Sequence, residues 1–251
     1  MEEFLYDCRW SEDCDEKFID DFNQVQDQVF QGEHSRESFK YQYIDNIYGS
    51  SVLVVVYMKN KPVAARGLWR NDVLEKEAYQ PGRACVLKEC RGKGVFTEMT
   101  MRALALLPKD AIIYTFPNQN SFPGYIKMGW KNIKQYFVRI FFSSKQFDKE
   151  HPLMMDAAYF NWWVKGRPNI QYIKRGKGYY LVRKYPRPFC YKVIAKVTKE
   201  IALTCKKAPC IAIYIYGSTK QTFYNKKTLP LRPVVRNQDL EYIPLWKIDA
   251  I

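Results

Sequence analysis

The chain has 251 residues, of which 47% are hydrophobic and 16% aromatic. This composition supports a packed core and excludes an intrinsically disordered protein. The net charge of +14 is uneven, because residues 1–50 have a net charge of −9 and the remaining residues one of +23. A basic body favours anionic partners, although a lysine-rich surface can also serve solubility alone. The longest apolar run, Val52–Met58, is far shorter than the roughly 20 residues of a membrane helix, so we expect no membrane span.

The first fifty residues predict a short strand and two helices. Residues 4–8 alternate weakly between apolar and polar side chains. Ser11 can cap the first helix, and the acidic residues that follow it suit the positive end of a helix dipole. One face of the first helix carries Phe18, Phe22, Val25 and Val29, and one face of the second carries Phe39, Tyr43 and Ile47.

The central region predicts a mixed α/β arrangement. Residues 52–58 and 63–69 are strand-like runs that flank the turn Lys59-Asn60-Lys61-Pro62, as in a hairpin. Further along the chain, the pattern predicts an extended segment at 78–87, a helix at 95–107, a buried strand at 111–116, a short helix that ends at Met128 and a strand at 130–142.

The second half is expected to form a smaller α+β domain. Helical patterns occur at 154–164 and 198–205, and strand-like segments at 171–174, 179–184, 191–197 and 210–216. Charged residues and a proline interrupt the pattern near 146–152. We therefore expect two domains, 1–146 and 147–251.

A glycine-bearing turn joins the extended segment at 78–87 to the following helix. It reads Cys90-Arg91-Gly92-Lys93-Gly94-Val95-Phe96. A pyrophosphate is held by backbone N–H groups that converge at a helix N-terminus, and glycine lets the backbone approach it closely. The turn is therefore a candidate phosphate-binding loop, although such a turn alone has low specificity.

A second motif follows the next predicted strand. Pro117-Asn118-Gln119-Asn120-Ser121 leaves that strand, and Tyr125-Ile126-Lys127-Met128-Gly129-Trp130 closes a short helix. Together the two segments resemble motifs A and B of the GNAT superfamily of N-acetyltransferases. The C-terminal hundred residues resemble, more weakly, the partial second acetyltransferase-like domain of some larger members. The resemblance implies an α/β fold with a GNAT-like central mixed β-sheet flanked by helices, and acetyl-CoA as the acyl donor.

The resemblance also implies roles for individual residues. The amide N–H of Leu87 would polarise the thioester carbonyl, and the phenol of Tyr125 would protonate the departing CoA thiolate. Without the resemblance, Tyr125 is a packed aromatic residue, and Arg91 and Lys93 are exposed bases. Asn118 and Asn120 either contact the pantetheine or cap the short helix. The residues expected to bind the cofactor are Val86, Leu87, Arg91, Gly92, Lys93, Gly94, Val95, Phe96, Asn118, Asn120, Ser121 and Tyr125.

The general base is left open, because this sequence departs from the family pattern. Glu89 occupies the position of the leading Gln or Arg, Lys88 replaces a common proline, and residues 83–88 contain no carboxylate. The candidates for the base are Glu77, Asp72 and Glu75, or a chain of water molecules. Each of these carboxylates can equally be a solvated surface charge.

Cysteines and histidines give no pattern typical of a metal site. The seven cysteines lack C-x-x-C spacing and there are two histidines, so we expect no metal. Reduced thiols, and an acidic N-terminus unlike a secretory signal, favour a cytoplasmic protein. Cys85 and Cys90 flank the loop without a histidine nearby in sequence, and we interpret them as packed side chains.

Three functions remain open from the sequence. The first is transfer of an acetyl group to a primary amine of a small anionic acceptor, such as a nucleotide-linked or polysaccharide amino sugar. The second is modification of DNA or RNA, because residues 145–230 contain 18 basic and 4 acidic residues with aromatic residues between them. Those aromatic residues can equally form the core of the second half, or part of a homodimer surface. The third is CoA binding without catalysis.

Overall fold

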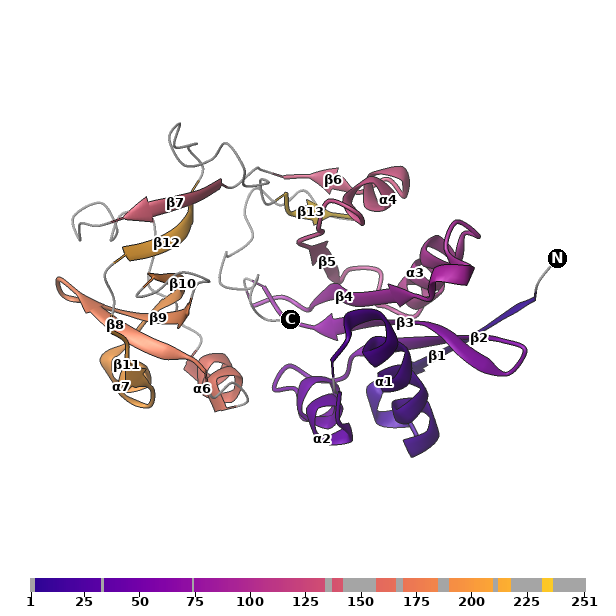
Figure 1. The fold of residues 1–251 in the computed structure, drawn as a ribbon, viewed down its shortest axis with the longest axis horizontal. Helices are drawn as coiled ribbons and strands as arrows, with labels where there is room; N and C mark the ends of the chain where they lie inside the picture. Colours follow the sequence, from indigo (N-terminus) through magenta and orange to yellow (C-terminus); the bar gives the residue numbers. More distant parts are fainter. Residues whose placement is uncertain are drawn as a thin grey trace. The chain divides into compact units, whose positions relative to one another are not determined.

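The computed structural model describes residues 3–32, 34–73, 75–133, 137–141, 157–165, 169–184, 190–209, 212–217 and 232–236. These residues form two compact units (Figure 1). Unit 1 contains the described residues up to 132 and the segment 233–236, and unit 2 contains those from 133 to 232. The expected boundary between residues 146 and 147 lies outside the described residues.

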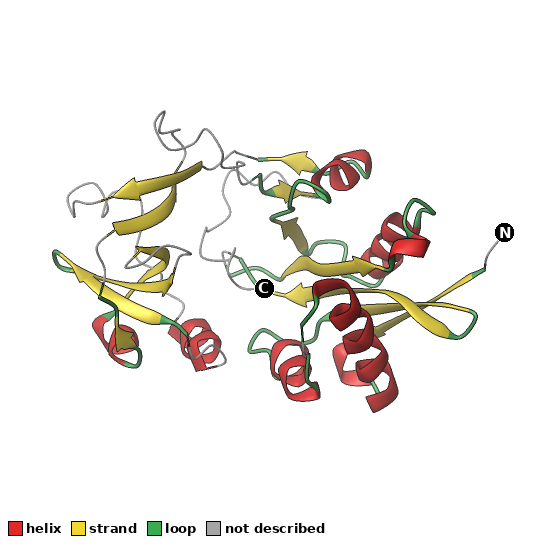
Figure 2. Ribbon diagram, viewed as in Figure 1, coloured by secondary structure: helices red, strands yellow, loops and turns green. Residues whose placement is uncertain are grey.

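Unit 1 contains a seven-stranded mixed sheet with the order β1-β2-β3-β4-β5-β13-β6 (Figure 1). Figure 2 shows the strands in yellow and the helices in red. Its strands are β1 Phe4–Trp10, β2 Val52–Met58, β3 Lys61–Arg70, β4 Ala78–Val86, β5 Ile112–Thr115, β6 Lys131–Asn132 and β13 Val234–Val235. The first four strands pair antiparallel, β5 is parallel to β4, and β13 is antiparallel to both β5 and β6. The predicted hairpin of β2 and β3 is confirmed, and Lys59 and Asn60 at its turn both have positive φ.

The α-helices described in unit 1 are α1 Glu16–Phe30, α2 Arg36–Phe39, α3 Val95–Ala105 and α4 Phe122–Lys127, and a π-helical turn, Lys40–Ile44, follows α2. The prediction that Ser11 caps α1 is wrong. Asp15 is the N-cap, and its carboxylate accepts a hydrogen bond from the Phe18 N–H at 2.8 Å. Ser11 is buried at the start of a short 3₁₀ turn, where its hydroxyl accepts a hydrogen bond from the Ser51 N–H at 3.1 Å.

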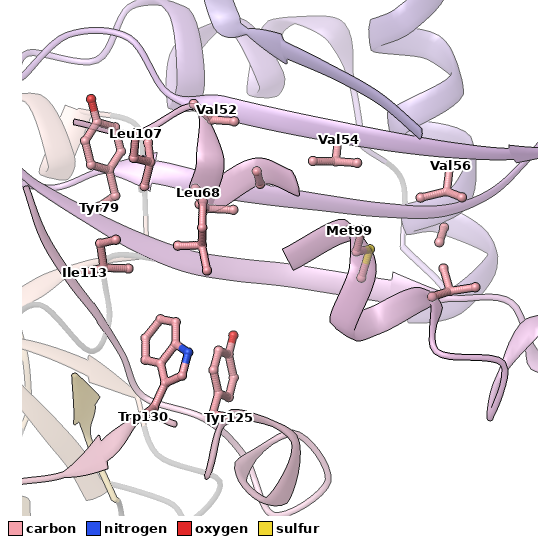
Figure 3. Packing of buried hydrophobic residues seen from close by; sticks show 14 of the residues in the cluster. Val52, Val54, Val56, Leu68, Tyr79, Met99, Leu107, Ile113, Tyr125 and Trp130 are labelled. Atoms are coloured by element: carbon pink, nitrogen blue, oxygen red, sulfur yellow. The ribbon is translucent and has the colours of Figure 1, made fainter. Parts of the chain in front are cut away.

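The core of unit 1 lies on both faces of its sheet. Val52, Val54 and Val56 pack in one cluster with Met99 of α3 (Figure 3). Successive side chains of a strand point to opposite faces, so Leu53 and Val55 are buried on the other face. Burial of both faces explains why β2 is a continuous apolar run rather than an alternating one.

Strands β4 and β5 pair only where β4 begins. The paired residues are Ala78 with Ile112 and Tyr79 with Ile113, after which β4 continues to Val86 without a β5 partner. The register between β3 and β4 also shifts between Ala65 and Gly67, opposite a segment in which Arg83 has a φ of +46°. This irregularity is a β-bulge, and such bulges bend a strand away from its neighbour. The outer part of β4 therefore has backbone groups that β5 does not use.

Unit 2 contains a six-stranded sheet with the order β11-β8-β9-β10-β12-β7. Its strands are β7 Phe137–Phe141, β8 Gln171–Arg175, β9 Gly178–Lys184, β10 Cys190–Val197, β11 Lys206–Lys207 and β12 Ala212–Gly217, and its described helices are α6 Ala157–Lys165 and α7 Lys199–Leu203. The predicted strands and helices of the second half are thus largely confirmed. The single strand expected over 130–142 is wrong, because β6 and β7 belong to different sheets. No helix in the described ranges is long and apolar enough to cross a membrane.

The chain path of unit 2 repeats part of the path of unit 1. In unit 1, three antiparallel strands (β2, β3 and β4) lead through α3 to the parallel strand β5. In unit 2, β8, β9 and β10 lead through α7 to β12, which is parallel to β10. The strand that pairs antiparallel with β12 is β7, and the strand that pairs antiparallel with β5 is β13. Each of these pairings joins segments that are far apart in the sequence.

Candidate active site

The loop between β4 and α3 contains two glycines in the left-handed region. Gly92 and Gly94 have φ values of +76° and +79°, which residues with a side chain rarely adopt. A Cβ at either position would meet no atom within 4 Å, so backbone conformation rather than space requires glycine here. Gly94 is the N-cap of α3 and supplies no side-chain cap, which leaves the first-turn N–H groups open to an external acceptor. A helix N-terminus of this kind favours an anion.

The residues beside this loop divide into exposed and buried ones. Arg91 is exposed, and its Nε donates to the Val86 carbonyl at 2.9 Å. Val95 is buried in the core cluster, so only its backbone can contact a ligand. Phe96 is half-buried, and its ring lies 5.7 Å from the Tyr125 ring in an edge-on arrangement. Around the loop, the predicted cofactor residues therefore expose mainly backbone groups and the Arg91 side chain.

Asn118 orders the turn that leads into α4. Its Oδ1 accepts hydrogen bonds from the N–H groups of Asn120 and Ser121, at 2.9 and 3.0 Å. Its carbonyl accepts from the Phe122 N–H at 2.9 Å. Asn118 therefore forms the turn before α4, whose N-cap is Ser121. Asn120 is exposed, and Ser121 is the N-cap without a side-chain capping bond.

Tyr125 lies on the buried side of α4, in contact with the sheet. It is 3% exposed, and its ring packs edge-on against Trp130 at 4.7 Å between centroids. Figure 3 shows the two rings side by side, with the tyrosine hydroxyl directed toward the strands. A Cβ at Gly124 would lie 3.0 Å from the Phe96 ring. The absence of a side chain at Gly124 therefore lets α4 approach α3 closely enough to place Tyr125 there.

The Tyr125 hydroxyl is hydrogen-bonded to a buried arginine that the sequence analysis did not identify. Arg66 of β3 is 0% exposed, and its two terminal nitrogens donate to the hydroxyls of Tyr125 and Thr100. The guanidinium carbon lies 5.0 Å from the centroid of the Phe96 ring and 5.4 Å from that of the Tyr125 ring. A sequence signal did exist, since Arg66 is the charged residue within an otherwise buried stretch of β3, 63–69. A charge at such a position is retained only if it is paired or has a function.

The predicted role of the Leu87 amide is opposed by the observed register. The Leu87 N–H donates to the Val63 carbonyl at 2.9 Å and is therefore engaged in the sheet. Backbone groups of successive strand residues point to alternate edges. The N–H of Val86, which precedes Leu87, is accordingly directed to the edge that β5 has left.

The predicted general base, Glu77, is engaged at the other end of β4. Its Oε1 lies 2.8 Å from Arg70 Nη1 and accepts a hydrogen bond from the Tyr79 hydroxyl at 2.7 Å. Burial, together with this bond to Glu77, raises the pKa of Tyr79 above its ordinary value. Nine residues of strand separate Glu77 from Val86, or roughly 30 Å. This distance and the ion pair both argue against Glu77 as a base beside the Val86 end of β4.

The other candidate bases show no better placement. Asp72 binds the same Arg70 through both carboxylate oxygens, at 2.5 and 3.2 Å. It also accepts a hydrogen bond from the Ala78 N–H at 3.1 Å, which holds it at the start of β4. Glu75 has a φ of +60° in the connection between β3 and β4. We therefore assign no side chain as the general base.

The cysteines beside the loop are buried. Cys85 is 2% exposed, and burial raises the pKa of its thiol to about 12. Cys90 is 0% exposed. A thiol that stays protonated, as at Cys85, is a poor nucleophile. The burial of both thiols agrees with their interpretation as packed side chains. Within the described ranges, no group of three His, Cys, Asp or Glu side chains is arranged to hold a metal ion.

Comparison with solved structures identifies the fold. No family model and no curated protein matches the sequence. A conserved protein of unknown function from Enterococcus faecalis V583 superposes with a TM-score of 0.59 at 12% identity, over 98% of this chain and 74% of that one. GCN5-related N-acetyltransferases from Anabaena variabilis and Kribbella flavida give TM-scores of 0.56 and 0.52 at 12% and 14% identity. These matches cover 93% and 92% of this chain, and 72% and 71% of the others. The chain therefore has the mixed α/β fold of the GCN5-related N-acetyltransferases, with a large sheet flanked by helices.

Proposed function

We propose that this protein is an acyl-CoA-dependent N-acyltransferase that moves an acetyl group from acetyl-CoA to a primary amine. One observation carries the proposal. Strand β4 separates from β5 directly before a loop with two left-handed glycines and the open N-terminus of α3. That combination offers strand N–H groups that β5 does not use to an acyl-pantetheine chain, and convergent N–H groups to a pyrophosphate.

The binding residues follow from this arrangement. The N–H groups from Gly92 to Phe96 would hold the pyrophosphate, with Arg91 and Lys93 supplying positive charge. The turn ordered by Asn118 would border the pantetheine. The Val86 N–H, rather than that of Leu87, would donate to the thioester carbonyl, because its direction is set by the Leu87–Val63 hydrogen bond.

The proposed chemistry is direct attack of the amine on the thioester. The amine nitrogen bonds to the carbonyl carbon, the carbon–sulfur bond breaks, and the electron pair leaves with sulfur. Tyr125 would supply the proton that converts the thiolate into CoA. No acyl-enzyme is needed, and the buried thiols of Cys85 and Cys90 are unsuited to forming one. The ammonium of the acceptor would lose its proton through water.

An anionic acceptor is the finer part of the proposal. Arg83 lies in the bulged part of β4, and its Nε is buried without a hydrogen-bond partner in the described chain. The fully buried Gln26 donates to the Arg83 carbonyl at 2.6 Å and fixes this part of the strand against α1. A phosphate or carboxylate of a small amine, such as a nucleotide-linked amino sugar, would accept hydrogen bonds from the Arg83 guanidinium.

The free cysteines, six of them within the described ranges, favour a cytoplasmic setting.

A nucleic-acid substrate is the second candidate function, carried by the basic composition of residues 145–230. Burial weighs against a stacking surface there, because Trp163 and Tyr180 are core residues of unit 2. Tyr172 and Tyr179 are half-buried and lie 6.3 Å apart between ring centroids. These two are the aromatic residues that would stack on bases.

We further propose that unit 2 is a partial acetyltransferase-like repeat, as its strand path indicates.

Calorimetric titration with acetyl-CoA tests the proposed function. Saturable binding at micromolar concentration is expected, and its absence up to millimolar concentration would refute the cofactor assignment. Thiol release in the presence of a panel of primary amines then separates an enzyme from a CoA-binding protein. Tyr125→Phe should retain binding and lower turnover about 100-fold or more. Binding to DNA or RNA that weakens steeply with added salt would favour the second candidate.

A further inference from the structure

The buried arginine beside Tyr125 has no counter-charge from the described residues. Arg66 is completely inaccessible to solvent, and its hydrogen-bond partners are two neutral hydroxyls, those of Tyr125 and Thr100. Its Nε is also buried and has no acceptor there. A buried, unpaired charge is strongly destabilising in a folded protein. Contact with the Phe96 and Tyr125 rings, at 5.0 and 5.4 Å, offsets only part of that penalty. The positive charge of Arg66 is therefore balanced only when an anion lies nearby.

The direction of the hydrogen bonds determines what Tyr125 can do. A guanidinium has donors and no acceptor, so the Tyr125 oxygen must accept from Arg66. The hydroxyl proton of Tyr125 is then free to point away from Arg66. Thr100 is in a different situation, because its hydroxyl accepts from Arg66 and donates to the Phe96 carbonyl at 2.5 Å. Of the two hydroxyls that Arg66 contacts, Tyr125 is thus the one with a proton left to give.

We propose that Arg66 is a positioning residue for the departing CoA thiolate and acts through Tyr125. This inference rests on the proposed function. Arg66 holds the Tyr125 oxygen as an acceptor, so the phenol donates its proton to sulfur when the carbon–sulfur bond breaks. The electron pair of that bond goes to sulfur, the proton from Tyr125 completes the CoA thiol, and the phenolate is left beside the guanidinium. The charge of Arg66 is matched at this step by the anion that the reaction creates.

The test needs no acceptor amine, because CoA itself presents the sulfur. A thiol ionises with a pKa of about 8.5, so the thiolate fraction rises about 25-fold between pH 7 and pH 9. We expect the wild-type protein to bind CoA about tenfold more tightly at pH 9 than at pH 7, as a charge-assisted hydrogen bond to sulfur would give. Desulfo-CoA, which lacks the sulfur atom, should show no such gain. Both affinities are measured by calorimetry.

Four variants decide whether Arg66 is responsible. Arg66→Met should abolish the pH-dependent gain for CoA and leave desulfo-CoA binding within about twofold. Tyr125→Phe should also abolish the gain, and adding Arg66→Met to it should change nothing further, because two residues that act in series are not additive. Thr100→Val is the matched control, since it removes the other Arg66 hydrogen bond and should preserve the gain.

The outcomes separate this inference from the proposed function. If neither CoA nor desulfo-CoA binds, the proposed function fails and the inference with it. If both bind and the wild-type protein shows no gain at pH 9, the cofactor assignment stands and the role of Arg66 is refuted. The same conclusion follows if Arg66→Met retains the gain. If Arg66→Met does not fold, Tyr125→Phe decides, because a gain that persists without the phenol hydroxyl cannot act through Tyr125.

Discussion

Replacement of Gly94 by alanine gives the sharpest test of the loop. Gly94 has a φ of +79° and is the N-cap of α3, where its carbonyl accepts from the Glu98 N–H at 3.0 Å. An added Cβ would meet no atom within 4 Å, so the change introduces no clash. Its effect comes from the backbone, because an L-residue in the left-handed region costs about 1–2 kcal/mol. We expect the free energy of unfolding to fall by about that amount.

Ligand binding should fall further than stability alone explains. The strained loop can relax by leaving the left-handed conformation, and the first N–H groups of α3 then no longer converge on one point. Loss of one hydrogen bond to a charged phosphate costs about 1.5–3 kcal/mol, which corresponds to an affinity loss of about 10- to 100-fold. Calorimetric titration of Gly94→Ala with acetyl-CoA measures this loss directly.

Gly49 provides the matched control in the same unit. It also has a positive φ, +112°, and a Cβ there would likewise meet no atom within 4 Å. Gly49→Ala should lower the free energy of unfolding by an amount similar to Gly94→Ala, yet bind acetyl-CoA like the wild-type protein. Equal affinities for all three proteins, despite matched losses of stability, would show that the loop does not hold the cofactor.

Two further predictions concern stability and thiol chemistry. The Phe18 N–H and Arg9 hold the pKa of Asp15 below its usual value of 3.8, so the stability Asp15 contributes is present above that pH and is lost as the pH falls through its folded-state pKa. The urea midpoints of the wild-type protein and Asp15→Ala should therefore differ at pH 7 and converge toward pH 3, and a constant difference would contradict this. Burial and the thiol pKa of about 12 should protect Cys85 from iodoacetamide at pH 8. Peptide mass spectrometry should find it modified only in urea, and rapid labelling of the native protein would be inconsistent with the structure.

The strands of unit 1 could be predicted because their sequences carry a strong local signal. The run at 52–58 is apolar on both faces, and the run at 63–69 is apolar apart from Arg66 and Gly67. Gly92 and Gly94 indicate the loop after β4. The N-cap of α1 could not be predicted from the sequence in the same way. Ser11 and Asp15 both have capping side chains, and the choice between them depends on the contact of Ser11 with Ser51, 40 residues away. Local propensity contains no information about that contact.

The role assigned to Leu87 failed for a related reason. In a strand, a shift of one residue exchanges the edge to which every N–H points. The bulge between Gly82 and Cys85 makes such a shift, and it depends on pairing with β3 rather than on the residues of β4 alone. The sequence could therefore place the loop within a few residues, but it could not decide between the N–H groups of Val86 and Leu87.

The two units show how a shared chain path can produce differently capped helix N-termini. In both, a helix connects a strand to its parallel neighbour, α3 in unit 1 and α7 in unit 2. The N-cap of α3 is Gly94, which gives no side-chain cap. The N-cap of α7 is Thr198, whose hydroxyl accepts a hydrogen bond from the Ile201 N–H at 3.4 Å. The side chain in unit 2 thus uses an N–H of the kind that has no side-chain cap in unit 1, and a threonine in place of a glycine accounts physically for the difference.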